Sequence, residues 1–221
     1  MRKIIITLDG YSGTGKSSTA RIVSEKLGYT YIDSGAMYRA VTYHFLNENI
    51  NLKDTQNIER ILRNIKIKFR KGRTFLNGQD VEDVIRSMAV NQYVSQVAAI
   101  SAVRVKLVQF QRKLGEEKGV VMDGRDIGTV VFPNADLKLF MTADMDIRVE
   151  RRKNQLLKKG IKENCDDIRC NFIKRDKIDT SREDSPLMKA EDAVEIDTTD
   201  LSLNDQVNNI VKLAENLIYG N

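Results

Sequence analysis

Residues 10–18, GYSGTGKSS, combine glycines with a lysine and several hydroxyl side chains directly behind the apolar run IIITLD. The spacing of Gly10, four residues, Gly15, Lys16 and Ser17 is typical of a loop that binds phosphate groups. In such a loop the backbone N–H groups converge on the phosphates, the lysine reaches the terminal phosphate and the following hydroxyl binds magnesium. The loop therefore predicts a site for a nucleoside triphosphate with Mg²⁺, formed by Gly10, Tyr11, Ser12, Gly13, Thr14, Gly15, Lys16, Ser17 and Ser18.

A parallel sheet covered by helices would position this loop. Short apolar segments that end near Asp or Gly alternate with helical patterns, and they read KIIITLD, YTYIDSG, GVVMDG, ADLKLFMTAD and AVEIDTT. This alternation favours an α/β fold with a five-stranded parallel sheet flanked by helices. The helix after the loop should begin near Ser17, bury Ala20, Val23 and Leu27, and end at Gly28. Its N-terminus would then lie at the loop, where an anion is favoured.

Two segments are longer than the connections of a parallel sheet require. The first, residues 36–118, follows the second predicted strand, and its stretches IKIKFR, RTFLN and QDVEDVI predict a small antiparallel unit. A continuous helical pattern then runs from Met88 to Leu114. The second segment, residues 148–187, contains two helical patterns joined near Gly160.

The excess positive charge lies in the second segment. The chain has a net charge of +5, and residues 148–182 contain 12 Lys or Arg against 6 Asp or Glu. This distribution fits a solvated helix face, a nucleic-acid surface or a lid over a polyanionic small molecule. Aromatic residues make up only 6% of the chain, Trp is absent and no nucleic-acid motif is recognised, which argues against the nucleic-acid surface.

Length and composition predict one compact domain, residues 1–221, because 221 residues with 41% hydrophobic content suit a single core. The N-terminal apolar run stops at Asp9 and no later stretch has membrane-spanning length, so we expect a cytoplasmic protein with no membrane partner. Cys165 and Cys170 have no nearby His or further Cys, since His44 is remote, and no zinc or redox site is expected.

The sequence lacks the motifs that mark two common classes of phosphate-loop protein, GTPase switches and motor ATPases. A GTPase switch reads guanine with an Asn-Lys-x-Asp pattern after a core strand, and no such pattern follows a predicted strand here. Gly124 follows Asp123, whereas a motor ATPase usually places there a Glu that activates water. The remaining alternative is transfer of the phosphoryl group to a second bound molecule, and a phosphorylated acceptor would need arginines.

Five further stretches carry a resemblance to a known family. DSGAMYR (33–39), SQVA (95–98), Arg104, DGRDIGTVVFP (123–133) and RDKIDTSREDSPL (175–187) occur in the order found in bacterial cytidylate kinases, which the chain resembles over most of its length. The resemblance implies a P-loop NTPase fold with an inserted NMP-binding subdomain, residues 36–118, and a short lid, residues 148–187. Two positions depart from the family pattern: Tyr11 replaces a common Pro, and Lys16 is followed by Ser17 and Ser18 rather than Gly-Thr or Ser-Thr.

The resemblance implies transfer of the terminal phosphoryl group of ATP to CMP or dCMP by a monomer, without nucleic-acid partners. Catalytic roles fall to Lys16, Arg125, Arg175 and Arg182. Arg39, Arg125 and Arg182 would bind the acceptor phosphate, with Ser34 and Tyr38 shaping that end of the pocket. Arg175 and Arg182 would also meet the charge that spreads over the transferred group. An ordinary surface salt bridge is the alternative for each of these arginines.

The family resemblance also implies how the base and the metal are bound. A carboxylate facing the amine of cytosine and a guanidinium facing N3 and O2 would read the base, roles that fall to Asp126 and Arg104 with Ser95 beside them. An ion pair with Arg125 or a turn is the alternative role for Asp126. The sugar would lie near Asp179 and Arg175, and Mg²⁺ near Ser17 and Asp123. Another small-molecule kinase of this fold, for uridylate, adenylate or shikimate, remains the rival, and the base-reading residues discriminate against it.

Overall fold

The chain folds around one parallel sheet. Residues 2–70, 72–158 and 160–220 are described in a computed structural model, so Met1, Lys71, Lys159 and Asn221 of the predicted ranges lie outside the described residues. Neighbouring strands are parallel in the order β2-β6-β1-β7-β8, which confirms the predicted five-stranded sheet. The strands are β1 (Ile5–Gly10), β2 (Thr30–Asp33), β6 (Val120–Asp123), β7 (Leu137–Thr142) and β8 (Val194–Asp197).

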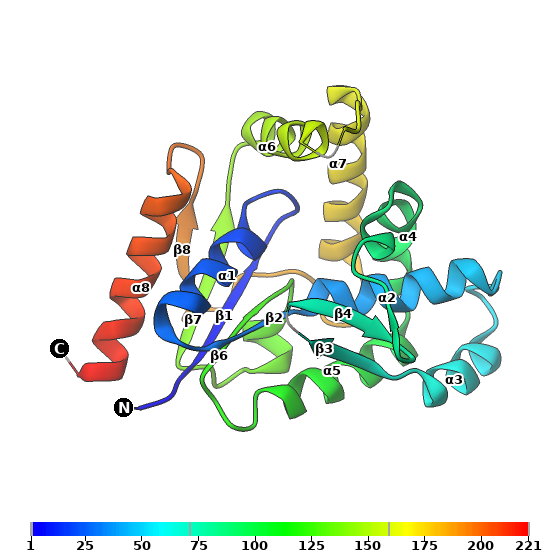
Figure 1. Ribbon diagram of the computed structural model, residues 1–221, viewed down its shortest axis with the longest axis horizontal. Coiled ribbons are helices and arrows are strands. Elements are labelled where there is room, and N and C mark those ends of the chain that lie inside the picture. Colours follow the sequence, from blue (N-terminus) through cyan, green and yellow to red (C-terminus); the bar gives the residue numbers. More distant parts are fainter. Residues whose placement is uncertain (1, 71, 159, 221) are drawn as a thin grey trace.

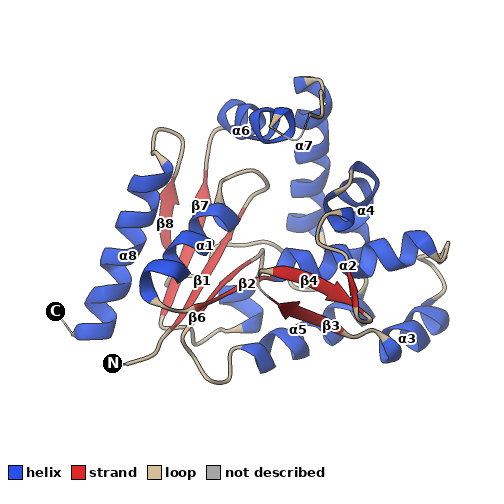
Figure 2. Ribbon diagram, in the orientation of Figure 1, coloured by secondary structure: helices blue, strands red, loops and turns tan. Residues whose placement is uncertain are grey.

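Helices cover both faces of the sheet (Figure 2), and residues along β1, β2 and β6 alternate between two apolar clusters, one on each face. On one face, Ile6 and Leu8 of β1 pack with α1 and α8. On the other, Val120 and Met122 of β6 join a cluster built with α2, α4 and α5. These helices are α1 (Lys16–Leu27), α2 (Ser34–Asn47), α4 (Met88–Ala98), α5 (Ser101–Leu114) and α8 (Leu203–Tyr219).

The segment between β2 and β6 contains the predicted antiparallel unit. The strands β3 and β4 pair antiparallel from Ile67–Leu76 to Arg70–Arg73, and β4 pairs with the short β5. Of the predicted third stretch QDVEDVI, residues 79–85, only Gln79 and Asp80 form a strand, and Val84 and Ile85 begin a 3₁₀ turn instead. The remaining elements of this segment are α3 (Thr55–Asn64), β3 (Ile67–Arg70), β4 (Arg73–Leu76), β5 (Gln79–Asp80) and η1 (Val84–Arg86).

The prediction of one continuous helix from Met88 to Leu114 is wrong. The chain leaves α4 after Ala98, and Ile100 is extended, with φ −77° and ψ 117°. Tertiary packing decides this break. Both helices contact α2, but α4 packs chiefly on α2 and also on α7, whereas α5 packs chiefly on α3 and the π-helical turn η2 (Ile127–Val131). The change of direction lets Ser95 and Arg104, from different helices, line the same cavity.

Two helices stand apart above the carboxyl ends of the strands, as Figure 1 shows. They are α6 (Met145–Leu157) and α7 (Cys165–Ser181), which confirms the two helices predicted around Gly160. Val149, Leu156, Ile168 and Phe172 give them a small apolar core of their own. None of the helices in the described ranges combines the length and apolar character that crossing a bilayer requires.

Candidate active site

The carboxyl ends of the strands bring the candidate residues to one edge of the sheet. In the register of the sheet, Asp123 of β6 lies opposite Leu8 of β1 and Asp33 of β2. Gly10 ends β1 with φ 142°, and a Cβ there would come within 2.1 Å of the Met141 carbonyl oxygen. Only glycine therefore lets the chain turn from β1 into the phosphate loop, residues 10–18.

The phosphate loop wraps around the side chain of Lys16. This side chain is buried, and its Nζ donates to the Tyr11 carbonyl oxygen at 2.5 Å and to Thr14 Oγ1 at 3.2 Å. Burial lowers the pKa of Lys16, Arg125 lowers it further, and Asp123 opposes both effects. A bound polyphosphate would place negative charge next to the Lys16 ammonium group and so favour its charged form.

Of the nine predicted loop residues, five line a cavity and four do not. Gly13, Gly15, Lys16, Ser17 and Ser18 line a cavity of about 640 Å³. Gly10, Tyr11, Ser12 and Thr14 do not line it, so among these described residues a direct contact with a ligand is favoured for the first group only.

Ser17 and Asp123 lie together at the edge of this cavity. Ser17 Oγ donates to Asp123 Oδ2 at 2.7 Å, and Tyr31 OH donates to Asp123 Oδ1 at 2.8 Å. Burial raises the pKa of Asp123 to about 6, Asp33 raises it too, and the two hydroxyl donors oppose the shift. A hydroxyl and one carboxylate suit Mg²⁺, which takes its remaining ligands from phosphates and water. No cluster of three or more His, Cys, Asp or Glu able to hold a metal occurs in the described part of the chain.

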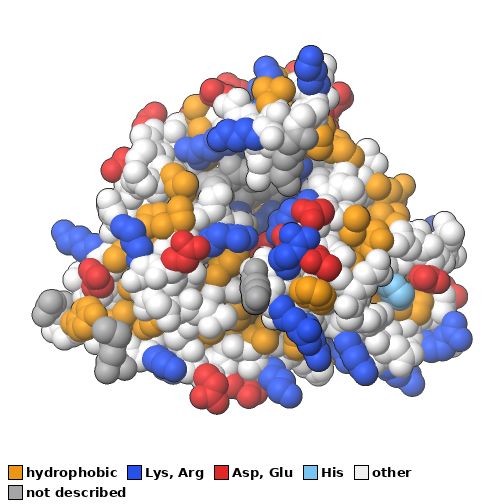
Figure 3. All heavy atoms as spheres, in the orientation of Figure 1, with side chains coloured by type: hydrophobic (Ala, Val, Ile, Leu, Met, Phe, Trp, Pro, Cys, Tyr) orange, Lys and Arg blue, Asp and Glu red, His pale blue; other side chains and the backbone are white. Residues whose placement is uncertain are grey.

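The cavity lies between the strand ends and the α6–α7 unit. Figure 3 shows the molecule hollowed beneath that unit, with Lys and Arg side chains around the hollow. All predicted acceptor residues line the cavity, and they are Ser34, Tyr38, Arg39, Ser95, Arg104, Arg125, Asp126, Arg175, Asp179 and Arg182. Residues from α2, α4, α5, α7 and the turn after β6 thus meet in one place.

Asp126 and Arg104 form a buried ion pair at one end of the cavity. Both side chains are only 3–5% exposed, and Arg182 Nη2 lies 3.5 Å from the second Asp126 oxygen. Arg125 makes no ion pair with Asp126, so the alternative of that pair is wrong. Burial raises the pKa of Asp126 and the two arginines oppose that shift. The Arg104 guanidinium also lies over the Tyr38 ring, 5.5 Å from its centroid.

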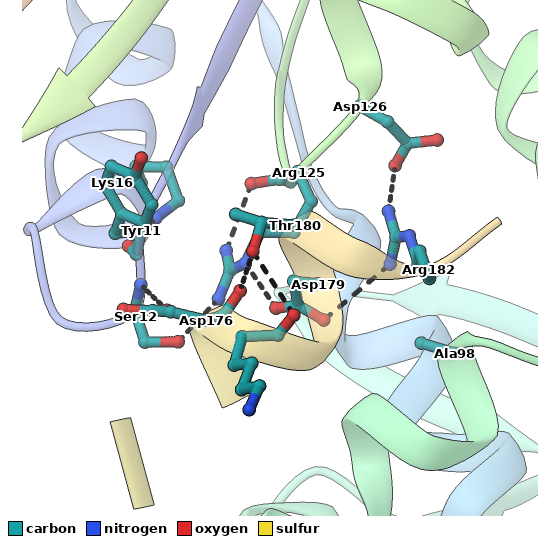
Figure 4. Close-up of polar contacts among 12 residues, drawn as sticks. Tyr11, Ser12, Lys16, Ala98, Arg125, Asp126, Asp176, Asp179, Thr180 and Arg182 are labelled. Atoms are coloured by element: carbon teal, nitrogen blue, oxygen red, sulfur yellow. Dashed lines mark hydrogen bonds and ion pairs between the residues drawn. The ribbon is translucent and has the colours of Figure 1, made fainter. Parts of the chain in front are cut away.

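Two cavity-lining arginines, Arg125 and Arg182, lie on either side of Asp179, as Figure 4 shows. Arg125 donates through Nε to Asp179 Oδ2 and through Nη2 to Ser12 Oγ, both at 3.0 Å. Arg182 Nη1 lies 3.7 Å from Asp179 Oδ1. These contacts place one carboxylate between two guanidinium groups.

Two partly buried arginines, Arg39 and Arg175, make no ion pair with a carboxylate in the described part of the chain. Burial lowers the pKa of Arg39 to about 9, and its Nη1 donates to the neutral Asn91 Oδ1 at 2.6 Å. Burial lowers the pKa of Arg175 to about 10, Arg125 lowers it further, and Arg175 Nε has no hydrogen-bond partner in the described structure. A cavity with such unpaired guanidinium groups favours a ligand with several negative charges.

Part of the cavity lining from α6 and from the region after β8 was missed by the sequence analysis. It consists of Arg151, Arg152, Gln155, Leu201, Ser202, Leu203 and Gln206. Arg151 donates to the Thr198 carbonyl oxygen at 2.5 Å and to Thr198 Oγ1 at 2.9 Å, which ties α6 to the loop after β8. The only sequence signal was the position of this loop behind a predicted parallel strand, where ligand-binding loops gather.

Asp9 connects the phosphate loop to the turn that carries Asp126. It precedes Gly10 in β1, and its two carboxylate oxygens accept the N–H groups of Ile127 at 2.9 Å and Gly128 at 2.7 Å. Burial raises the pKa of Asp9 to about 7, and these two N–H donors oppose the shift.

The stability of the protein should fall as the pH rises through the pKa of Asp9. Between the ordinary pKa of an Asp and about 7, the folded state holds a proton at Asp9 that the unfolded state does not, so the free energy of unfolding decreases with rising pH. Asp9→Asn should reduce this slope, whatever it does to the absolute stability. Urea unfolding of both proteins at several pH values and constant ionic strength measures the slopes, and equal slopes would refute the assignment.

Comparisons with known proteins identify the family. The family model described as cytidylate kinase matches residues 6–216. The chain is 48% identical to "Cytidylate kinase" of Cytophaga hutchinsonii over 97% of this chain and 94% of that protein. It is likewise 48% identical to "Cytidylate kinase" of Flavobacterium psychrophilum, over 98% of this chain and 100% of that protein.

A solved structure supports the fold alone. An uncharacterized protein from Eubacterium ventriosum has a TM-score of 0.50 and 15% sequence identity, with 100% of both chains covered. The match of the family model to most of the chain, together with relatives at 48% identity, shows that the chain belongs to the cytidylate kinase family.

Proposed function

We propose that this protein transfers the terminal phosphoryl group of ATP to CMP or dCMP, giving ADP and CDP or dCDP. The observation that carries the proposal is the ion pair of Asp126 and Arg104, which lies in the same cavity as two arginines without an ion pair, Arg39 and Arg175. The first pair has the donors and acceptors for cytosine, and the second offers charge to phosphates. The names of the curated relatives support the same reaction.

The donor ATP would lie along the phosphate loop. Lys16 and the N–H groups of Gly13, Gly15 and Ser17 would bind its phosphates, and Arg151 with the loop 201–203 would border its adenine. Ser17 and Asp123 fit Mg²⁺, which would neutralise charge on the donor phosphates. On binding, Lys16 would exchange its contacts with Tyr11 and Thr14 for phosphate oxygens.

The acceptor would lie between the base-reading pair and the arginines. Its cytosine would contact Asp126 and Arg104 beside Ser95, and its sugar would lie near Asp179 and Arg175. Arg39, Arg125 and Arg182 would bind its phosphate, with Ser34 and Tyr38 at the same end of the pocket. The ion pairs of Asp126 and Asp179 with arginines keep these side chains in place until the nucleotide takes over part of their contacts.

Transfer would need positioning and charge rather than a general base. A phosphate oxygen of the acceptor is already anionic, so it attacks the terminal phosphorus of ATP while the bond to the bridging oxygen of ADP breaks. Lys16, Arg125, Arg175 and Arg182 would stabilise the charge that spreads during this step. We propose that residues 36–118 form the NMP-binding subdomain and that residues 148–187 form a lid that excludes water. A cytoplasmic monomer that binds no nucleic acid completes the proposal.

An acceptor panel tests the proposed function. ADP formation from ATP and Mg²⁺ should be fast with CMP and dCMP, and slow with UMP, AMP and shikimate. Omitting the acceptor gives the background of ATP hydrolysis, and omitting Mg²⁺ tests the metal. Preference for any acceptor other than CMP or dCMP would refute the proposal.

A further inference from the structure

Ser12 of the phosphate loop is held by side chains from both helices above it. Asp176 of α7 accepts the Ser12 N–H at 3.1 Å through Oδ1, a contact drawn in Figure 4. Arg148 of α6 donates through Nε to the Ser12 carbonyl oxygen at 2.6 Å, and its Nη2 forms an ion pair with Asp176 Oδ2. The two side chains thus bind both sides of one residue and also each other.

The residues on either side of Ser12 add packing to this contact. The Arg148 guanidinium lies 5.6 Å from the centroid of the Tyr11 ring and 5.4 Å from that of the Phe172 ring. Phe172 covers Gly13 so closely that a Cβ at Gly13 would come within 2.7 Å of its ring. Tyr11 therefore takes part in the contact between the loop and the helices.

Asp176 and Arg148 have no place in the reaction proposed above. Neither side chain lines the cavity, and Asp176 is 9% and Arg148 5% exposed. On the same helix as Asp176, however, Arg175 and Asp179 do line the cavity, and Gly13 and Lys16 line it from the loop. The Asp176–Ser12 contact therefore ties the loop directly to α7, beside the bridge that Arg125 makes from Ser12 Oγ to Asp179 Oδ2.

We propose that Asp176 and Arg148 are positioning residues that fix the phosphate loop relative to Arg175 and Asp179. The inference rests on the proposed function, in which the loop holds the donor phosphates and α7 faces the acceptor. Glycines with positive φ at positions 10, 13 and 15 leave the loop backbone few restraints of its own, so outside contacts must fix it. A displacement of about 1 Å between reacting groups can lower a rate by about a hundredfold.

Asp176→Asn tests the inference with little change in shape. The Asn oxygen can still accept the Ser12 N–H, but the ion pair with Arg148 is lost. We expect kcat to fall by about 10- to 100-fold, with KM for ATP and for CMP within about threefold of wild type, because geometry is lost rather than binding. Asp167→Asn makes the same chemical change at an exposed position of the same helix and should leave both constants unchanged.

A double-mutant cycle separates positioning from folding. Arg148→Gln, Asp176→Asn and the double variant should all show low kcat, and the double variant should lose no more than the worse single variant, because both side chains act on Ser12. The double variant also leaves no unpaired buried charge, so it carries the test if a single variant fails to fold in a thermal unfolding measurement.

Two outcomes would overturn the inference. One is a folded variant, single or double, with kcat within about twofold of wild type; the other is a raised KM for ATP with unchanged kcat. These results differ from failure of the proposed function, which would appear as a wild-type protein that does not phosphorylate CMP.

Discussion

Lys16→Ala is expected to fold and to lose nearly all phosphoryl transfer. Lys16 is the buried cation of the phosphate loop, and its Nζ donates to the Tyr11 carbonyl oxygen and the Thr14 hydroxyl, both within the loop. Removing one preorganised charged donor from a transition state costs about 3 to 4 kcal/mol. We therefore expect kcat/KM with CMP to fall by about 100- to 1,000-fold.

The matched control for this variant lies on the same helix. Lys26→Ala removes an exposed lysine of α1 that donates to Asn208 Oδ1 at 3.1 Å, and it should keep wild-type turnover. Steady-state kinetics with CMP and circular dichroism on all three proteins give the comparison. Near wild-type turnover of a folded Lys16→Ala protein would end the assignment of the phosphate loop.

Asp126→Asn should erode the preference for CMP over UMP. Uracil presents an acceptor oxygen where cytosine has its amine, so Asp126 would lose its donor. Uracil also presents an N3–H donor where cytosine has an N3 acceptor, so Arg104 would lose its acceptor as well. A two-bond base contact discriminates by about 1 to 3 kcal/mol and an unpaired buried carboxylate adds more, so wild type should prefer CMP by at least about a hundredfold in kcat/KM. Asn can still accept from the cytosine amine but carries no charge, and its amide can turn to donate to uracil.

The expected change is a fall of about tenfold or more in the CMP to UMP ratio, mainly through loss of CMP activity. Because Asp126 also pairs with the buried Arg104 and Arg182, thermal unfolding must accompany the kinetics. Asp167→Asn serves again as the exposed control. If the ratio is unchanged in a folded Asp126→Asn protein, the base is read by other residues.

Local patterns in the sequence predicted most of the frame. Short apolar runs ending at Asp or Gly predicted the parallel strands, and Gly28 ends α1 in the left-handed conformation as expected of a glycine there. The phosphate loop was predictable because it binds phosphate through its backbone, and the backbone shape that this requires is encoded by certain residue types at a fixed spacing. Family motifs predicted the acceptor residues, and all ten side chains line one cavity.

The break between α4 and α5 was not predictable in this way. Residues 88–114 keep a helical pattern throughout, and nothing in their local order requires the extended backbone at Ile100. The break arises because the two halves share α2 but otherwise pack against different elements, α7 for the first half and α3 and η2 for the second. Helical propensity is a weak preference that tertiary packing overrides.

Sequence by itself predicted the phosphate loop, the parallel sheet and the set of side chains proposed to meet the acceptor, since these follow from residue type, short-range spacing and the order of family motifs. Only the tertiary structure decided which charges face one another: Asp126 pairs with Arg104 and Arg182 rather than Arg125, and Asp176 with Arg148 holds Ser12 from outside the loop. Arg148 and Ser12 are separated by 136 positions along the chain. Such contacts join elements whose relative placement depends on the packing of the whole core, and no local pattern encodes them.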